Sequence, residues 1–181
     1  CNFPETAAVD GGSKRYYSDI TGWDGSGWWK AGRLRQSLAY GVAVPVPGGF
    51  IYIGGHNSRG SQAAVDRYFL AKGSLPVVES LPSLPRPIDN MAGVIRGSRI
   101  FIAGGIEAGE PSNSLYAFDL AKPEKGWELL SVFPGPPRVQ PVLTAAQHNG
   151  KLQLYLFGGF AGAGAHRPAS VSSDGLRYDV D

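Results

Sequence analysis

At three places along the chain, a pair of adjacent glycines directly follows a short, largely apolar run. The runs read FIYIGG, with Gly54-Gly55, RIFIAGG, with Gly104-Gly105, and LQLYLFGG, with Gly158-Gly159. The second glycines of the three pairs are 50 and 54 residues apart. A period near 50 residues is typical of a repeat architecture in which each repeat is one supersecondary unit. The glycine pairs therefore predict a chain built from copies of one unit.

The three units share further landmarks. An aromatic strand follows each pair (Tyr68, Tyr116 and Tyr178), and an arginine flanked by turn residues precedes it (Arg35, Arg86 and Arg138). A fourth strand lies between the tyrosine and the next arginine. This pattern resembles the kelch repeat, whose units are the four-stranded blades of a β-propeller. We therefore predict an all-β, kelch-type propeller in which each glycine pair ends the second strand, where neighbouring blades crowd and positive φ is needed.

The strand count predicts about three blades. We expect one propeller segment over residues 1–181, with a partial blade at 1–34, blades at 35–85 and 86–137, and an incomplete blade at 138–181. Propellers close with four to eight blades, so an open arc would leave blade faces unpaired. We expect a segment of a six-bladed propeller, completed by the rest of a longer chain or by association of two arcs.

Composition excludes several classes of partner. The net charge of +2 is too small to indicate nucleic-acid binding, and Lys and Arg form no run interleaved with aromatics. No apolar run approaches the 18 residues that would predict a membrane span. Cys1 is the only cysteine, so the sequence predicts no internal disulfide. The 26 glycines and 14 prolines are spread along the chain, as expected for many turns between short strands.

Longer stretches carry a narrower resemblance. KRYYSDITGWDGSGWWKAGRLRQSLAYGVAVPVPGGFIYIGG is similar to the last two blades of the sialic acid (N-acetylneuraminate) mutarotase/epimerase family, and IDNMAGVIRGSRIFIAGG and PPRVQPVLTAAQHNGKLQLYLFGG resemble its first two. Here the first blades follow the last, as in the cyclically permuted branch of that family. The opening CNFPETAAVDGGSKRYY also resembles that branch.

The resemblance implies an isomerase that interconverts the α and β anomers of N-acetylneuraminic acid without a metal or organic cofactor. Ring opening needs a base for the anomeric hydroxyl and an acid for the ring oxygen, and a carboxyl group with a tuned pKa suits this work. The substrate's carboxylate favours arginine, whose planar fork binds it through two hydrogen bonds. Family analogy also implies export to the periplasm.

Two sets of loops are expected to open on the channel face of the propeller. They offer as candidate substrate-binding residues His56, Asn57, Arg59, Asn90, Arg35, Arg86 and Arg138, and further polar side chains in Glu110, Asn113, Asp89, His166 and Arg167. Recurring arginines would give a positive potential suited to an acidic sugar. The alternative is that the repeat's own arginine braces neighbouring blades through backbone carbonyls.

Glu107 is the candidate catalytic residue, with a solvated loop carboxylate as the alternative. The resemblance implies a glutamate directly after the second strand's glycines and an arginine six residues later. In GGIEAGEPSNS, Glu107 stands one position late and Asn113 occupies the arginine position, so the motif is not matched. We expect the catalytic pair to lie beyond Asp181.

Other activities have weaker sequence support. His56, His148 and His166 are far apart and show no metal-ligand spacing, so no metal site is predicted. A copper oxidase of the galactose oxidase type would need a cross-linked cysteine, and Cys1 stands alone at the start. Cys1 also allows a lipidated N-terminus. A kelch module that binds a protein or glycan without catalysis remains the alternative function.

Overall fold

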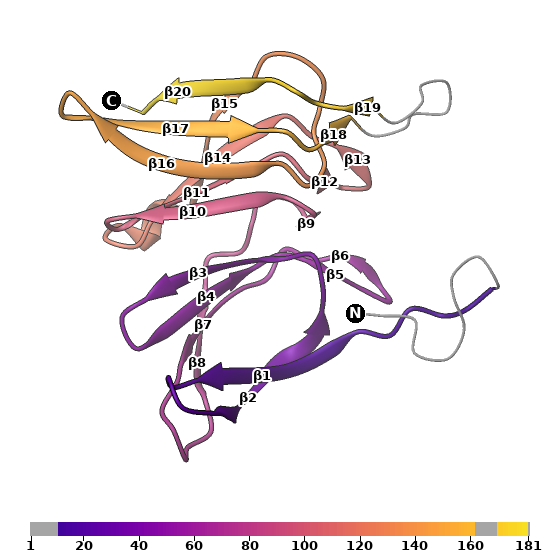
Figure 1. Ribbon diagram of the computed structural model, residues 1–181, viewed down its shortest axis with the longest axis vertical. Helices are drawn as coiled ribbons and strands as arrows, with labels where there is room; N and C mark the ends of the chain where they lie inside the picture. Colours follow the sequence, from indigo (N-terminus) through magenta and orange to yellow (C-terminus); the bar gives the residue numbers. More distant parts are fainter. Residues whose placement is uncertain (1–10, 162–169, 181) are drawn as a thin grey trace.

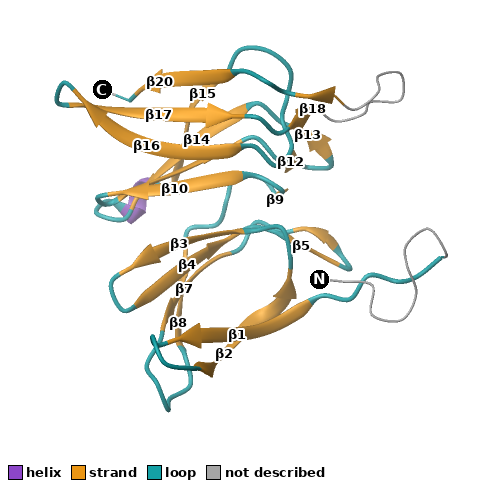
Figure 2. Ribbon diagram, in the orientation of Figure 1, coloured by secondary structure: helices purple, strands orange, loops and turns teal. Residues whose placement is uncertain are grey.

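The computed structural model describes residues 11–161 and 170–180, whose regular secondary structure is almost entirely antiparallel β-strand (Figure 2). One turn of 3-10 helix, η2, spans Pro123–Lys125. No helix among these residues is long and apolar enough to cross a membrane.

Four sheets carry most of the chain. A two-stranded sheet holds β1 (Tyr17–Trp23) and β2 (Trp28–Leu38). Two four-stranded sheets follow, with strand orders β3-β4-β7-β8 and β10-β11-β14-β15, and the next sheet has the order β16-β17-β20. Figure 1 shows these sheets following one another through the molecule. The repeated strand order confirms the kelch-type β-propeller fold.

The strands of these three larger sheets have the following bounds: β3 (Val42–Val46), β4 (Gly49–Ile53), β7 (Val65–Phe69), β8 (Val77–Leu81), β10 (Ala92–Arg96), β11 (Arg99–Ala103), β14 (Ser114–Asp119), β15 (Trp127–Val132), β16 (Val142–His148), β17 (Lys151–Phe157) and β20 (Gly175–Asp179). Each glycine pair ends β4, β11 or β17, and each landmark tyrosine lies on β7, β14 or β20, as the sequence predicts.

The core lies between the sheets. Along β11, Ile100 and Ile102 face one hydrophobic cluster, shared with the sheet of β3 to β8. Phe101 and Ala103 face a second cluster, shared with the sheet of β16, β17 and β20. Successive strand residues point to opposite faces, so a strand buried on both faces is apolar throughout. This is why residues 100–103, IFIA, form a continuous apolar run.

The glycine pairs have the predicted left-handed backbone at crowded positions. Gly54, Gly55, Gly104 and Gly105 have φ between 58° and 99°. A Cβ atom on Gly104 would lie 2.6 Å from the carbonyl oxygen of Arg138, which belongs to the connection into the next sheet. A side chain at this position would therefore both strain the backbone and collide with the neighbouring blade.

Short strands gather at one end of the sheets, which we call the hairpin end (Figure 1). There the segment entering each blade pairs with the hairpin that follows its glycine pair: Ala39 with His56, β9 with β12, and Val139 with Phe160. The short strands are β5 (His56–Asn57), β6 (Gly60–Ser61), β9 (Ile88–Asp89), β12 (Ile106–Glu107), β13 (Glu110–Pro111), β18 (Phe160–Ala161) and β19 (Ser170–Val171). The two predicted sets of loops thus meet at one end.

A line of non-glycine residues with positive φ links the blades at this end. Tyr40, Asn90 and Gln140 have φ of 58°, 54° and 53°. The Asn90 N–H donates to the Tyr40 carbonyl, and the Gln140 N–H donates to the Asn90 carbonyl, both at 2.8 Å. The repeat therefore places equivalent residues one beside the next and connects successive blades through their backbones.

The first predicted blade boundary differs from the strand boundary. Arg35 lies inside β2, which runs to Leu38, rather than in a loop that opens a new blade. The strand continues because β1 pairs with it as far as Leu38. The numbers of blades and of chains in the closed propeller stay predictions.

Candidate functional site

A basic groove of about 530 Å³ lies at the hairpin end, between the segment before β1, the end of β2 and the β5–β6 hairpin. We call it the basic groove; its lining residues are Lys14, Arg15, Tyr16, Arg35, Gln36, Ser37, Asn57, Ser58 and Arg59. Four of these side chains are cationic, and none of the described lining residues is Asp or Glu. The groove therefore suits an anionic ligand with further hydrogen-bonding groups.

Lys14 is held at the edge of the groove by Tyr40. Its Nζ donates to the Tyr40 hydroxyl at 2.7 Å and lies 4.7 Å from the centre of that ring. This hydrogen bond raises the pKa of Lys14, against the opposing effect of burial. The ammonium group is consequently charged at neutral pH.

The Arg35 side chain lines the groove and also contacts the neighbouring sheet. Its Nη1 donates to Asp66 Oδ1 at 3.2 Å and also to Ser80 Oγ, and its Nη2 donates to the Val78 carbonyl at 3.1 Å. These contacts tie β2 to β7 and β8. Because Asp66 offsets its charge, Arg35 serves the packing of the sheets as well as the groove wall.

Asn57 holds the loop that presents Arg59. The buried Asn57 side chain accepts a hydrogen bond from the Arg59 backbone N–H at 2.8 Å and donates to Gln36 Oε1 at 3.2 Å. This arrangement closes a local turn through an asparagine side chain. The Arg59 side chain is exposed at the tip of the hairpin and has no ionic partner among the described residues.

His56 forms a pair with a buried carboxylate beside the groove. His56 Nδ1 lies 2.8 Å from Asp89 Oδ2, and the Asp89 side chain is 2% exposed. Ser61 Oγ donates to the same oxygen at 2.6 Å, and Asn90 Nδ2 donates to Asp89 Oδ1. Asn90, predicted as a ligand contact, thus supports Asp89 and also accepts a hydrogen bond from Gln140 Nε2.

Glu107 is enclosed by hydroxyl groups. Tyr116 Oη donates to its Oε1 at 2.7 Å, and Ser112 and Ser114 donate to its Oε2 at 2.7 and 3.0 Å. Burial raises the pKa of Glu107, but these hydrogen bonds and the charge of Arg86 outweigh it and leave the pKa below its usual range. Such a carboxylate is a weak base, and neither Glu107 nor Arg86 lines the basic groove.

Arg86 and Arg138 occupy equivalent repeat positions but different environments. The Arg86 side chain is 68% exposed, and its Nε lies 3.9 Å from Glu107 Oε1. Arg138 is fully buried, and its Nη2 donates to Asp174 Oδ2 at 2.7 Å while Nη1 donates to the Gly158 carbonyl at 3.4 Å. The surroundings of Arg138 are those of the predicted bracing alternative.

Some residues named from the sequence lie outside the described residues, and some residues that line the groove were not predicted. His166, Arg167 and Cys1 fall among the undescribed residues. Lys14, Arg15 and Tyr16 line the groove, but none of the repeat landmarks in the sequence marks them as candidate site residues. The adjacent basic residues Lys14 and Arg15 are the sequence feature that could have identified this part of the groove.

Within residues 11–161 and 170–180, no three His, Cys, Asp or Glu side chains cluster so as to hold a metal ion.

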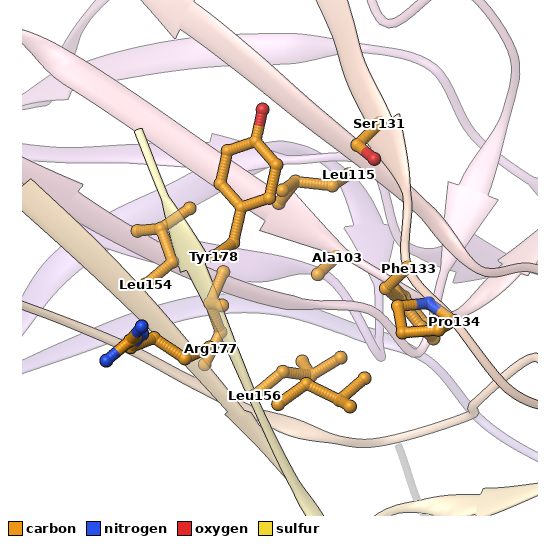
Figure 3. A pocket seen from close by; sticks show the side chains of 11 residues that line it. Ala103, Leu115, Ser131, Phe133, Pro134, Leu154, Leu156, Arg177 and Tyr178 are labelled. Atoms are coloured by element: carbon orange, nitrogen blue, oxygen red, sulfur yellow. The ribbon is translucent and has the colours of Figure 1, made fainter. Parts of the chain in front are cut away.

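A second, smaller cavity lies between two sheets. It has a volume of about 90 Å³ and is bounded by Ala103, Leu115 and Phe133 on one side and by Leu154 and Tyr178 on the other. Figure 3 shows these side chains around it, with the Arg177 guanidinium group at the periphery. The cavity is too small and too apolar for a charged sugar, whereas the basic groove brings four cationic side chains together and is the candidate site.

The repeated sheets and the basic groove define a kelch-type propeller with a cationic site at its hairpin end. No protein-family model matches the chain. It is 33% identical over 99 residues to N-acetylneuraminate epimerase of Salmonella enteritidis PT4, an alignment covering 55% of this chain and 24% of the relative. It is 42% identical over 53 residues to N-acetylneuraminate epimerase of Brucella suis, covering 29% and 14% of the two chains.

The fold is also similar to the solved structure of YjhT, with a TM-score of 0.65, 16% identity, and coverage of 96% of this chain and 51% of that one. The matched region thus spans about a quarter of the Salmonella relative's length and half of the YjhT chain. The predicted resemblance to the N-acetylneuraminate epimerase family is confirmed. The permuted blade order stays a prediction.

Proposed function

We propose that the protein is an N-acetylneuraminate mutarotase that interconverts the α and β anomers of this sugar acid. The observation that carries the proposal is the basic groove, which lies in a propeller similar in sequence to N-acetylneuraminate epimerases. Family resemblance alone leads us to extend the proposal to an exported, periplasmic protein, and to a propeller completed by further chain or by a second copy.

The groove offers the chemistry that a sugar acid needs. A carboxylate accepts paired hydrogen bonds from a guanidinium group, and Arg59 is the exposed arginine at the groove's hairpin. Gln36, Ser37 and Ser58 provide donors and acceptors for hydroxyl and acetamide groups. The volume of about 530 Å³ is within the usual range of small-molecule sites, roughly 300 to 1,000 Å³.

Recognition of the carboxylate also positions the reacting carbon. In N-acetylneuraminic acid the carboxylate is attached to the anomeric carbon, so an arginine that binds it fixes the distance of the anomeric hydroxyl and the ring oxygen from the groove wall. Anomer interconversion then needs only proton transfer between these two oxygens, with no redox step. A purely binding propeller would use the same groove without a proton-transfer group.

Proton NMR tests the proposal. N-acetylneuraminic acid enriched in the α anomer, freshly released from an α-linked sialoside, is incubated with or without the purified protein that carries this sequence, and the H3 signals of both anomers are followed. We expect the protein to speed the approach to equilibrium in proportion to its concentration. An unchanged rate with saturable binding of the sugar acid would instead identify a non-catalytic binding module.

A further inference from the structure

We propose that His56, oriented by the buried carboxylate of Asp89, transfers the proton between the two oxygens of the anomeric carbon. This inference rests on the proposed mutarotase function and assigns a proton-transfer group to its site. It is independent of the glutamate-arginine pair that the family resemblance implies, which the described residues do not match.

The hydrogen bonds around Asp89 indicate which tautomer the neutral His56 ring adopts. Asp89 Oδ2 accepts from Ser61 Oγ at 2.6 Å and lies 2.8 Å from His56 Nδ1. An ionised carboxylate only accepts hydrogen bonds, so we assign the proton to Nδ1, which leaves the lone pair on Nε2. Within the described part of the chain, Nε2 has no hydrogen-bond partner. A neutral imidazole in this tautomer is ready to take a proton.

The His56 ring lies next to residues that line the basic groove, although His56 is not itself a lining residue. His56 directly precedes Asn57, a lining residue, and its ring centre is 6.0 Å from that of Tyr16, another lining residue. The His56 side chain is 36% exposed, whereas Asp89 is 2% exposed. The Asp89 carboxylate is thus enclosed by protein, and the imidazole remains partly exposed beside the groove, which is what the proposal requires.

Asp89 can also stabilise the charged intermediate state of the ring. When Nε2 takes a proton, the imidazolium cation forms against a carboxylate that is shielded from water, where their attraction is stronger than at the surface. The Ser61 and Asn90 side chains keep that carboxylate in place. Asp89 is therefore a positioning residue, and His56 is the group that exchanges the proton.

The chemical step balances with one base. Nε2 takes the proton of the anomeric hydroxyl, the electron pair of that O–H bond forms the C=O bond of the 2-keto acid, and the bond between the anomeric carbon and the ring oxygen breaks. The ring oxygen keeps that bond's electron pair and receives the proton from Nε2. Rotation about the bond between the former anomeric carbon and the next carbon of the sugar chain, followed by the reverse step, gives the other anomer. Both oxygens are attached to the same carbon, so one imidazole can serve them in turn.

The test compares His56→Ala with the matched variant His148→Ala. His148 is an exposed histidine at the end of β16, next to the β16–β17 turn and away from the hairpin end. We expect His56→Ala to lower kcat for anomer interconversion by about 10²-fold or more, with KM changed less than about threefold, because general acid–base catalysis contributes about that much. Added imidazole should restore part of the kcat of His56→Ala. His148→Ala should match the wild type.

A second variant, Asp89→Asn, keeps the side chain's shape and should lower kcat with no response to imidazole, while circular dichroism checks that each variant is folded. A folded His56→Ala with wild-type kcat, or one whose loss lies entirely in KM and is not relieved by imidazole, overturns this inference and leaves the mutarotase proposal standing. A wild type that does not accelerate interconversion overturns both.

Discussion

At the scale of single residues, the glycine pairs have two roles, one in the backbone conformation and one in the packing between blades. Their φ values lie in the left-handed region, and their missing side chains leave room for the carbonyl groups of the neighbouring connections. The sequence predicts both properties, because three pairs in register with tyrosine and arginine are difficult to explain as ordinary hairpin glycines. The spacing of the glycine pairs along the sequence does not show which carbonyl group each glycine faces.

Substitution of two glycines with almost the same φ allows the cost of backbone strain to be measured apart from the cost of crowding. Gly97, with φ of 60°, lies in the β10–β11 turn with open space around it, whereas Gly104, with φ of 67°, faces the Arg138 carbonyl. We expect Gly97→Ala to cost about 1 kcal/mol of unfolding free energy. Gly104→Ala should cost about 1 to 3 kcal/mol more, because its Cβ overpacks the contact between blades. Urea denaturation measures both, and equal losses would contradict the crowding argument.

The hydroxyl cage of Glu107 predicts a pH-dependent contribution to stability. Its folded-state pKa is lowered, so the stabilisation is fully present above the ordinary glutamate pKa of about 4.3 and is lost as pH falls through the folded-state value. We expect Glu107→Gln to cost about 1 to 2 kcal/mol at pH 7 and progressively less in acid.

Chemical denaturation between pH 3 and pH 7 checks this expectation, with Glu110→Gln as the control. Glu110 is exposed in the same hairpin, so its replacement should change the unfolding free energy by less than about 0.5 kcal/mol at neutral pH. A difference between wild type and Glu107→Gln that is the same at every pH would refute the role of the carboxylate charge.

At the scale of elements, equivalent positions in the repeat do not have equivalent surroundings. Arg86 and Arg138 are 52 residues apart and both precede a blade's first strand. The Asp174 side chain and the Gly158 carbonyl enclose Arg138, while Arg86 extends to solvent beside Glu107. The repeat predicts where an arginine stands in a blade, but burial depends on residues more than 15 positions away that the spacing does not specify.

These two arginines give a matched pair of substitutions. Arg138→Met should lower the unfolding free energy by about 3 kcal/mol, near the low end for a broken buried ion pair because Asp174 is half-exposed. Arg86→Met should change it by less than about 0.5 kcal/mol, as expected for an exposed side chain. Denaturant midpoints provide the comparison, and similar losses in the two variants would argue against Arg138 as the brace.

At the scale of the whole molecule, the groove combines segments that belong to different predicted units of the repeat. The β5–β6 hairpin was predictable as part of the channel face because it follows a glycine pair. Lys14, Arg15 and Tyr16 were not, since they precede β1 and reach the hairpin only through the tertiary fold. The sequence therefore predicts the fold and three of the nine lining residues of the groove, Arg35, Asn57 and Arg59, whereas Lys14, Arg15 and Tyr16 join it through a contact that spans about forty residues.

Binding of the sugar acid through its carboxylate is the central claim, and calorimetric titration tests it most directly. N-acetylneuraminic acid and its uncharged methyl ester are titrated into the wild type, Arg59→Ala and the control Arg96→Ala, whose exposed arginine lies at the β10–β11 turn. We expect the wild type and the control to prefer the acid, and Arg59→Ala to bind it about tenfold or more weakly, as for a lost hydrogen bond to a charged group. Equal affinity for acid and ester, or an unchanged Kd in Arg59→Ala, would contradict the account.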